Sequence, residues 1–157
     1  MFKKCVLKVA VTALEAAKRV CELSNWTITN LKLQKMLYLA HMFHLGSNGM
    51  PLINEEFEAW DYGPVVPSLY HKVKVFSDRP IRNVFNVEIS NDLSEIIFLD
   101  QKYKELNDKS PWELVLMTHL KNGAWEKYYK EKMIGRSNKI VNVSILEEYR
   151  QFYDTAT

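Results

Sequence analysis

The sequence predicts an α+β fold that is mostly helical, with a central buried helix and a small antiparallel sheet. Residues 31–45 are apolar on almost every side, as expected for a helix that other elements surround. Several further segments repeat apolar residues every three or four positions, which is the period of an amphipathic helix. Strand-like alternation is confined to short stretches, the clearest of which is residues 57–65.

The length and composition of the chain indicate one domain and exclude a strong charge bias. Of its 157 residues, 47% are hydrophobic and 12% are aromatic, which is enough apolar surface for a sizeable core. No linker or internal repeat divides residues 1–157. The formal net charge is +2, so the composition does not favour nucleic acid as a partner.

The cysteines and the N-terminal segment indicate the compartment. Cys5 and Cys21 are expected on one helix or its approach, roughly 24 Å apart along the axis, and should not pair. Free thiols without a disulfide framework are typical of a reducing setting. Lys8 and Glu15 interrupt the apolar N-terminal run, and no later stretch is long enough to span a membrane. We therefore expect a soluble, cytoplasmic protein.

Two helices are expected before the first strand. Residues 6–23 repeat apolar side chains at helical spacing and carry charged side chains on the other face. The central helix over residues 31–45 follows, with Thr29 or Asn30 as its N-cap. Gly46 stands where this helix is expected to end, because glycine readily adopts the left-handed conformation of a C-cap.

Polar side chains form one stripe on the otherwise apolar central helix. Gln34, Tyr38 and His41 are four and three positions apart, so they share a face. An internal hydrogen-bonded network and a site that receives a polar group from a partner are both compatible with this spacing.

A Gly-Pro corner is expected to separate strand from helix. Residues 52–62 hold one or two short strands, and Gly63 can take the positive φ that a turn often needs. Pro64 cannot donate to a ladder, so the strand should end at this corner. Pro67 suits the first turn of a helix over residues 67–76, where its missing N–H costs nothing.

The side chains around this corner are the candidate partner-binding residues: Glu58, Trp60, Tyr62, Tyr70 and His71. Large aromatic side chains on a rigid turn bury much area at low entropic cost, which is typical of anchors in protein interfaces. The alternative is that Trp60 and Tyr62 only cover the central helix. Both interpretations hold if one face packs inward and the other faces solvent.

The second half of the chain is expected to be largely helical. Residues 81–89 alternate weakly and are either a strand or irregular, and Asn91 or Asp92 is the expected cap of the next helix. Capping boxes are expected where a serine precedes a glutamate by three positions, at Ser110 and at Ser144. The expected segments are helices over residues 93–106, 111–120, 124–132 and 145–152, with a short extended piece at 140–143.

No cofactor, metal site or enzyme activity is expected. His41 and His44 are three apart on a helix, yet no cysteine or carboxylate stands at ligand spacing beside them. A glycine-rich phosphate loop and a nucleophile elbow are both absent from the sequence. An enzyme that uses Tyr38, His41 or His71 in a cavity is the weakest of three hypotheses.

Two motifs resemble a known family and carry the leading hypothesis. LQKMLYLA at residues 33–40 and FEAWDYGPV at residues 57–65 resemble the SocA-like or Panacea antitoxin domain, which includes phage-associated proteins called GepA-like. The resemblance extends over about residues 10–153, with His119 and Trp125 among the looser C-terminal matches. It implies a non-enzymatic protein that binds a cognate protein toxin, and in SocA-like cases an adaptor that delivers the toxin to a Clp-type protease.

The alternative hypothesis is a nucleic-acid-binding transcriptional regulator of phage or mobile-element origin. Its basis is a cluster of basic residues in and after the helix that follows the corner: Lys72, Lys74, Arg79 and Arg82. Such a cluster would contact phosphates, and its binding would depend on salt concentration. The sequence does not predict the oligomeric state.

Overall fold

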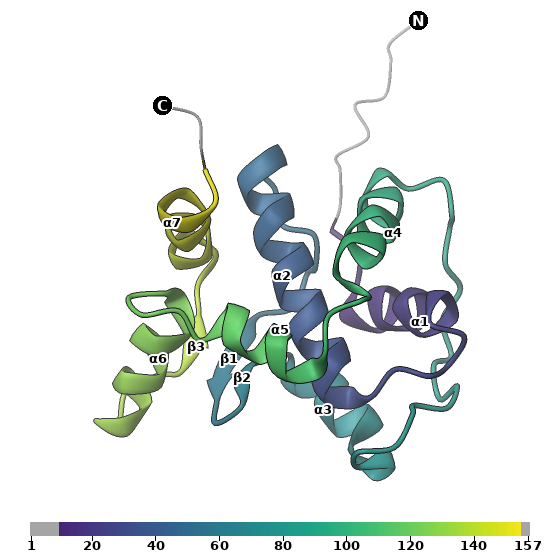
Figure 1. Ribbon diagram of the computed structural model, residues 1–157, viewed down its shortest axis with the longest axis horizontal. Coiled ribbons are helices and arrows are strands. Elements are labelled where there is room, and N and C mark those ends of the chain that lie inside the picture. Colours follow the sequence, from purple (N-terminus) through teal and green to yellow (C-terminus); the bar gives the residue numbers. More distant parts are fainter. Residues whose placement is uncertain (1–9, 155–157) are drawn as a thin grey trace, which may run out of the picture.

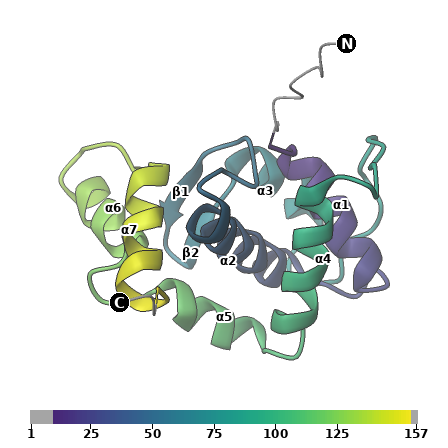
Figure 2. The same cartoon turned by 90° about the horizontal axis from the view of Figure 1, so that it is seen from above.

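Helix α2 (Asn30–Asn48) runs through the middle of the fold, and the other elements surround it (Figures 1 and 2). The protein is represented by a computed structural model that describes residues 10–154. The other elements, in chain order, are α1 (Ala13–Leu23), β1 (Phe57–Trp60), β2 (Gly63–Val65), α3 (Pro67–Val73), the 3-10 helix η1 (Lys74–Phe76), α4 (Ser94–Leu106), α5 (Pro111–Thr118), α6 (Ala124–Met133), β3 (Lys139–Ile140) and α7 (Asn142–Phe152).

The central position predicted for this helix is confirmed. Helix α2 contacts α1, α3, α4, α5, α7 and strand β2. Apart from the half-buried Phe43, its apolar residues from Leu33 to Leu45 are buried on several faces. Burial of such side chains is the main favourable term in folding. The fold is thus α+β and mostly helical, as predicted. No helix among residues 10–154 is long and apolar enough to cross a membrane.

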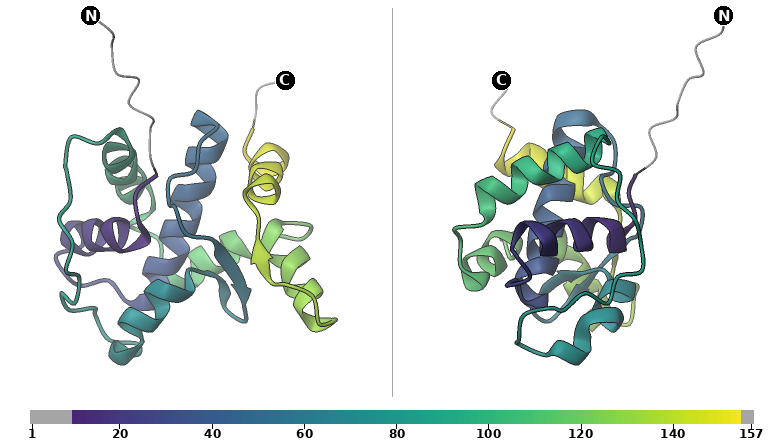
Figure 3. Two further views of the ribbon diagram at one scale, coloured as in Figure 1. Left: turned by 180° about the vertical axis from the view of Figure 1, so that it is seen from behind. Right: turned by 90° about the vertical axis from the view of Figure 1, so that its right-hand side faces the viewer.

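A small antiparallel sheet lies beside the lower half of α2, in the order β2-β1-β3. Strands β1 and β2 form a hairpin that extends between α3 and α6 (Figure 3). Phe57, Ala59 and Val65 are buried, as their alternation predicts. The sheet therefore packs one face on the core and leaves the hairpin turn at the surface.

The expectation that the strand ends at Gly63 and Pro64 is wrong, because these residues begin β2. The turn is made by Asp61 and Tyr62, and Gly63 has a φ of 111°. Ala59 stands opposite Pro64 and donates its N–H to Asn138 O on the other side, at 2.9 Å. No ladder hydrogen bond therefore requires an N–H from Pro64, which is why an edge strand tolerates it.

The ends of two helices differ from the predictions. Helix α2 continues through Gly46 to Asn48, and its C-cap is Gly49 with a φ of 68°. Gly46 packs against the ring of Tyr149, so the missing side chain serves a close helix contact and not a cap. Leu93, and neither Asn91 nor Asp92, is the N-cap of α4, and it provides no side-chain hydrogen bond.

The capping boxes give one confirmed and one wrong prediction. Ser110 Oγ accepts from Glu113 N at 3.1 Å, and Glu113 Oε2 accepts from Ser110 N at 2.6 Å. Ser144 lies inside α7, which already begins at Asn142, and its hydroxyl is 3.0 Å from Tyr128 OH. The second serine is therefore part of the packing between α6 and α7.

Two segments contain less regular structure than the sequence patterns predict. They are the N-terminal helix and the segment before α4. Helix α1 begins at Ala13, with Thr12 Oγ1 accepting from Glu15 N at 3.2 Å. The part of the expected helix at residues 6–9, and Cys5 with it, lies outside the described residues. Residues 81–89 form no strand and are irregular.

Candidate functional site

A cavity of about 490 Å³ opens beside the β1–β2 hairpin, where the first half of α2 meets α3. Its volume falls in the range of about 300–1,000 Å³ that is usual for binding pockets. We name it the hairpin cavity. Its lining residues come from α2, the hairpin, α3 and η1 with the turn after them, and the end of α6: Asn30, Leu31, Gln34, Lys35, Trp60, Asp61, Tyr62, Val65, Tyr70, Lys74, Ser77, Asp78 and Lys132.

Aromatic side chains form one wall of this cavity, and most of them are held in place. The rings of Trp60 and Tyr70 meet edge to face with centroids 4.8 Å apart. Trp60 Nε1 donates to Glu58 Oε2 at 2.9 Å, and Trp60 O accepts from Trp125 Nε1 at 2.7 Å. Tyr62 is at the turn and 68% exposed. The wall thus joins a fixed pair of rings to one ring that faces solvent.

Lys35 is a buried lysine in the lining of this apolar cavity. It is 1% exposed, and its Nζ donates to Pro64 O at 2.8 Å. Among the described residues, no carboxylate oxygen lies within 4.0 Å of this amine. Burial lowers the pKa of Lys35 to about 7, because the charged form loses its hydration. Near pH 7 the amine is therefore a mixture of charged and neutral forms.

The Gly-Pro corner is shaped to accommodate this lysine. A Cβ at Gly63 would lie 2.9 Å from Lys35 Cε and 3.0 Å from Thr118 Oγ1. The φ of 111° is also one that residues other than glycine rarely adopt. Gly63 therefore lets β2 approach α2 closely enough for the Pro64 carbonyl to accept from Lys35 Nζ.

Aromatic side chains of α6 and of the turn before it form a stack that hydrogen-bonds to the hairpin. His119 stacks on Trp125 with centroids 3.8 Å apart, and Trp125 stacks on Tyr129 at 4.8 Å. Tyr129 OH donates to Asp61 Oδ1 at 2.8 Å. Burial and the nearby charge of Lys35 lower the pKa of His119. The hairpin is thus connected to α6 by two hydrogen bonds, from Trp125 Nε1 to Trp60 O and from Tyr129 OH to Asp61 Oδ1.

The structure brings three of the five candidate partner-binding residues together. Trp60, Tyr62 and Tyr70 line the hairpin cavity. Glu58 lies outside the lining and orients Trp60 through its carboxylate. His71 is exposed beside this wall, with its ring 5.6 Å from that of Tyr70 and 6.4 Å from that of Trp60. The aromatic members therefore face one cavity, and the two polar members flank it.

The polar stripe of α2 is divided among separate neighbours. Gln34 lines the cavity, and its Oε1 accepts from Val66 N at 3.0 Å. Tyr38 OH donates to Glu148 Oε2 at 3.0 Å. His41 Nδ1 accepts from Ile53 N at 3.1 Å, so its Nε2 donates to Asn142 Oδ1, at 2.9 Å. Tyr38 and His41 are fully buried and do not line the hairpin cavity.

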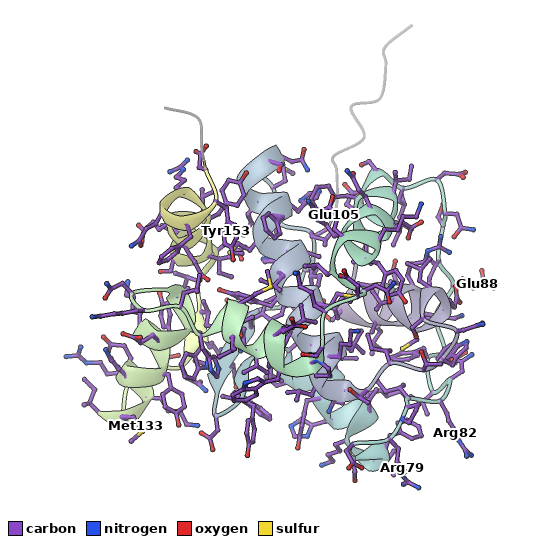
Figure 4. All side chains as sticks on the ribbon, viewed as in Figure 1. Arg79, Arg82, Glu88, Glu105, Met133 and Tyr153 are labelled. Atoms are coloured by element: carbon purple, nitrogen blue, oxygen red, sulfur yellow. The ribbon has the colours of Figure 1, made fainter. Side chains whose placement is uncertain are left out.

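The basic residues of the alternative hypothesis are exposed. Lys72 lies on α3 and Lys74 begins η1, while Arg79 and Arg82 follow in the irregular segment. Figure 4 places the two arginines at the edge of the molecule opposite Met133, which ends α6. Lys74 also lines the hairpin cavity, so the cluster and the cavity adjoin.

Other reactive side chains offer no second site. Within residues 10–154, no group of three or more His, Cys, Asp or Glu residues is placed to hold a metal ion. His44 Nδ1 donates to Met50 O at 2.6 Å. Cys21 is buried, and burial raises the pKa of its thiol to about 12, so the thiol is not an activated nucleophile.

Lys35 is the site residue that the sequence analysis did not single out. Its position carried a signal, because it follows Leu31 by four and precedes Leu39 by four on a helix expected to be buried. A lysine on the apolar face of such a helix either extends to solvent or becomes a buried amine. Here the hairpin covers it and makes it a buried amine.

Comparison with protein-family models identifies the class of protein to which this chain belongs. The family model described as "Antitoxin SocA-like, Panacea domain" matches residues 33–126, which is more than half of the chain. The chain therefore belongs to this family. The family is described as one of SocA-like antitoxins.

A curated relative agrees with this assignment. Antitoxin SocA of Caulobacter vibrioides (strain NA1000 / CB15N) is 34% identical over 113 residues, which cover 63% of this chain and 58% of the relative. The chain thus spans somewhat more than half of that relative's length. No solved structure matches the chain.

Proposed function

We propose that this protein neutralises a cognate toxin by binding it directly, and that the hairpin cavity is the contact surface. Family membership supports the antitoxin role, and the cavity supports the site. The observation that carries the proposal is the position of Tyr62, which is 68% exposed at the cavity beside the fixed rings of Trp60 and Tyr70. Rigid aromatic groups next to a concave apolar surface are the usual anchors of protein interfaces.

Co-expression with the adjacent reading frame of the genome tests the neutralisation. We expect the product of that frame to stop growth when expressed alone, and this chain to restore growth and to co-purify with it. A harmless product that does not co-purify with this chain would contradict the proposal. Growth and co-purification are measured in the same strains.

Tyr62→Ala tests the contact surface. A central aromatic anchor contributes about 2 kcal/mol or more to binding, so we expect the affinity for the toxin to fall roughly thirtyfold. The folded chain should keep its stability, because the side chain is at an exposed turn. Trp112→Ala is the matched control, since Trp112 is 60% exposed on α5 and does not line the cavity. Equal affinities of the two variants would place the contact elsewhere.

Delivery of the toxin to a Clp-type protease is the finer part of this proposal. An adaptor would shorten the lifetime of the toxin only in cells that contain the protease. We expect the toxin to be stable in a strain without the protease even when this chain is present. A toxin lifetime that does not depend on the protease would leave neutralisation by binding alone.

A transcriptional regulator is the second candidate, supported by the exposure of Lys72, Lys74, Arg79 and Arg82. If this cluster contacts phosphates, affinity for DNA should fall steeply with salt, with a slope that reflects the number of contacts. Arg79→Ala should then reduce the slope by about one contact. Retention on DNA that does not respond to salt would remove this candidate.

A further inference from the structure

We propose that the hairpin cavity receives an acidic side chain of the protein partner, together with a neighbouring aromatic or aliphatic residue, and that Lys35 Nζ pairs with the carboxylate. This inference rests on the proposed function, because the partner is the toxin. It adds the chemistry by which the partner is recognised.

The buried amine of Lys35 is incompletely paired. An ammonium group carries three N–H donors, and Lys35 Nζ makes one hydrogen bond in the described part of the chain, to Pro64 O. Removing such a charge from water costs several kcal/mol unless an opposite charge compensates it. A carboxylate supplied by the partner would compensate the charge and use the remaining donors.

The other charged groups of the lining do not compensate the charge of Lys35. Asp61 accepts from Tyr129 OH, and no oxygen of Asp61 or Asp78 is within 4.0 Å of the amine. Lys74 and Lys132 add positive charge to the same cavity. Lysines in the lining therefore outnumber its acidic residues, which favours an anionic occupant over a cationic one.

The walls of the cavity beside the amine are largely apolar. Leu31, Trp60, Val65 and Tyr70 provide apolar surface beside the amine. A carboxylate alone would leave this surface in contact with water, whereas a hydrophobic residue next to it would bury both kinds of surface. The cavity therefore fits an acidic residue adjacent to an apolar one in a protein segment.

Pairing with a carboxylate has a pH signature, because it raises the pKa of Lys35 from its free value of about 7. The carboxylate then binds best when the amine is charged, below pH 7, and loses its advantage as the pH rises. The other charged or titratable groups near the amine are Asp61, Lys74, Asp78 and Lys132 of the lining, and His119. Burial and the charge of Lys35 lower the pKa of His119.

The test uses two blocked dipeptides that differ in one group, acetyl-Phe-Glu-amide and acetyl-Phe-Gln-amide. Binding to the purified chain is followed by the NMR signals of the Lys35 side chain and by Trp fluorescence. A rise of one pH unit in the pKa of Lys35 corresponds to a tenfold preference. We expect the Glu peptide to bind about tenfold more tightly than the Gln peptide at pH 6, and equally at pH 9.

Lys35→Met should abolish this preference, whereas Lys32→Met should keep it. Lys32 is the matched control, because it lies on the same helix and donates to a backbone carbonyl, Asn107 O at 2.7 Å, outside the cavity. The pH series on the wild-type chain keeps the test decisive if Lys35→Met does not fold.

The inference would be overturned by equal binding of the two peptides at pH 6, by a preference that persists in Lys35→Met, or by a preference unchanged at pH 9. Tighter binding of 3-phenylpropionate than of either peptide would assign the cavity to a small organic acid and also overturn it. None of these results bears on the growth and co-purification test of neutralisation, so the two proposals fail separately.

Discussion

Replacing Lys35 by methionine should stabilise the protein at pH 6, although it removes a hydrogen bond. The pKa of this lysine is about 7 in the fold and 10.5 in its unperturbed form. Between these values the unfolded chain binds the proton and the folded chain does not, so protonation favours unfolding as the pH falls. At 1.36 kcal/mol for each unit of pKa, the penalty is about 5 kcal/mol at pH 6 and about 2 kcal/mol at pH 9.

The substitution also has a cost, because Pro64 O loses the donor at 2.8 Å and stays buried. An unsatisfied buried carbonyl costs about 2 kcal/mol. The net effect of Lys35→Met is therefore a gain of about 3 kcal/mol at pH 6 and nearly no change at pH 9. Removing a residue that serves binding and not folding commonly stabilises a protein in this way.

Urea denaturation of the wild-type chain, Lys35→Met and Lys32→Met at pH 6, 7.5 and 9 measures these differences. The free energy of unfolding of the wild type should rise with pH relative to that of Lys35→Met, while Lys32→Met should follow the wild type. Comparing variants cancels the contributions of the histidines and of Cys21. A Lys35→Met variant that is less stable at pH 6, with the pH dependence of the wild type, would refute the reasoning.

The remaining predictions concern two glycines that lie against other side chains, Gly63 and Gly46, with Gly49 as a control that has no such contact. Gly63→Ala should lower the free energy of unfolding by about 3 kcal/mol, because its φ of 111° is strained for alanine and the new Cβ would displace Lys35. Gly49→Ala should lower it by about 1 kcal/mol, because its φ is 68° but an added Cβ would meet no other atom. Equal costs in urea denaturation would contradict the role assigned to the Lys35 contact. Gly46→Ala should cost about 2 kcal/mol or more by pushing α7 away from α2, and loss of the ring contacts of Tyr149 should be visible by NMR.

Most of the fold follows from periodicity in the sequence, and the exceptions have tertiary causes. The run from Leu33 to Leu45 requires burial on several faces, and the structure provides it. Gly46 resembles a helix end locally, but Tyr149, far away in the sequence, fills the space beside it. Ser144 and Glu147 have the spacing of a capping box, yet α7 begins two residues earlier.

The candidate site was predictable in its aromatic part and not in its charged part. Trp60, Tyr62 and Tyr70 stand close together in the sequence, so their shared wall follows from a short hairpin and one helix turn. Strand β2 lies against Lys35, whose Nζ donates to Pro64 O, and that contact depends on Gly63. Local patterns contain no information about which distant strand will cover a lysine, so the buried amine required the structure.

We propose that the hairpin cavity binds the toxin through Lys35, and the side-chain NMR signal of that residue in the complex tests this binding most directly. In a complex of this chain with the product of the adjacent reading frame, the pKa of Lys35 should rise above its free value of about 7 by one unit or more. The signal of Lys32 should not change. An unchanged Lys35 signal in a fully formed complex would contradict the claim.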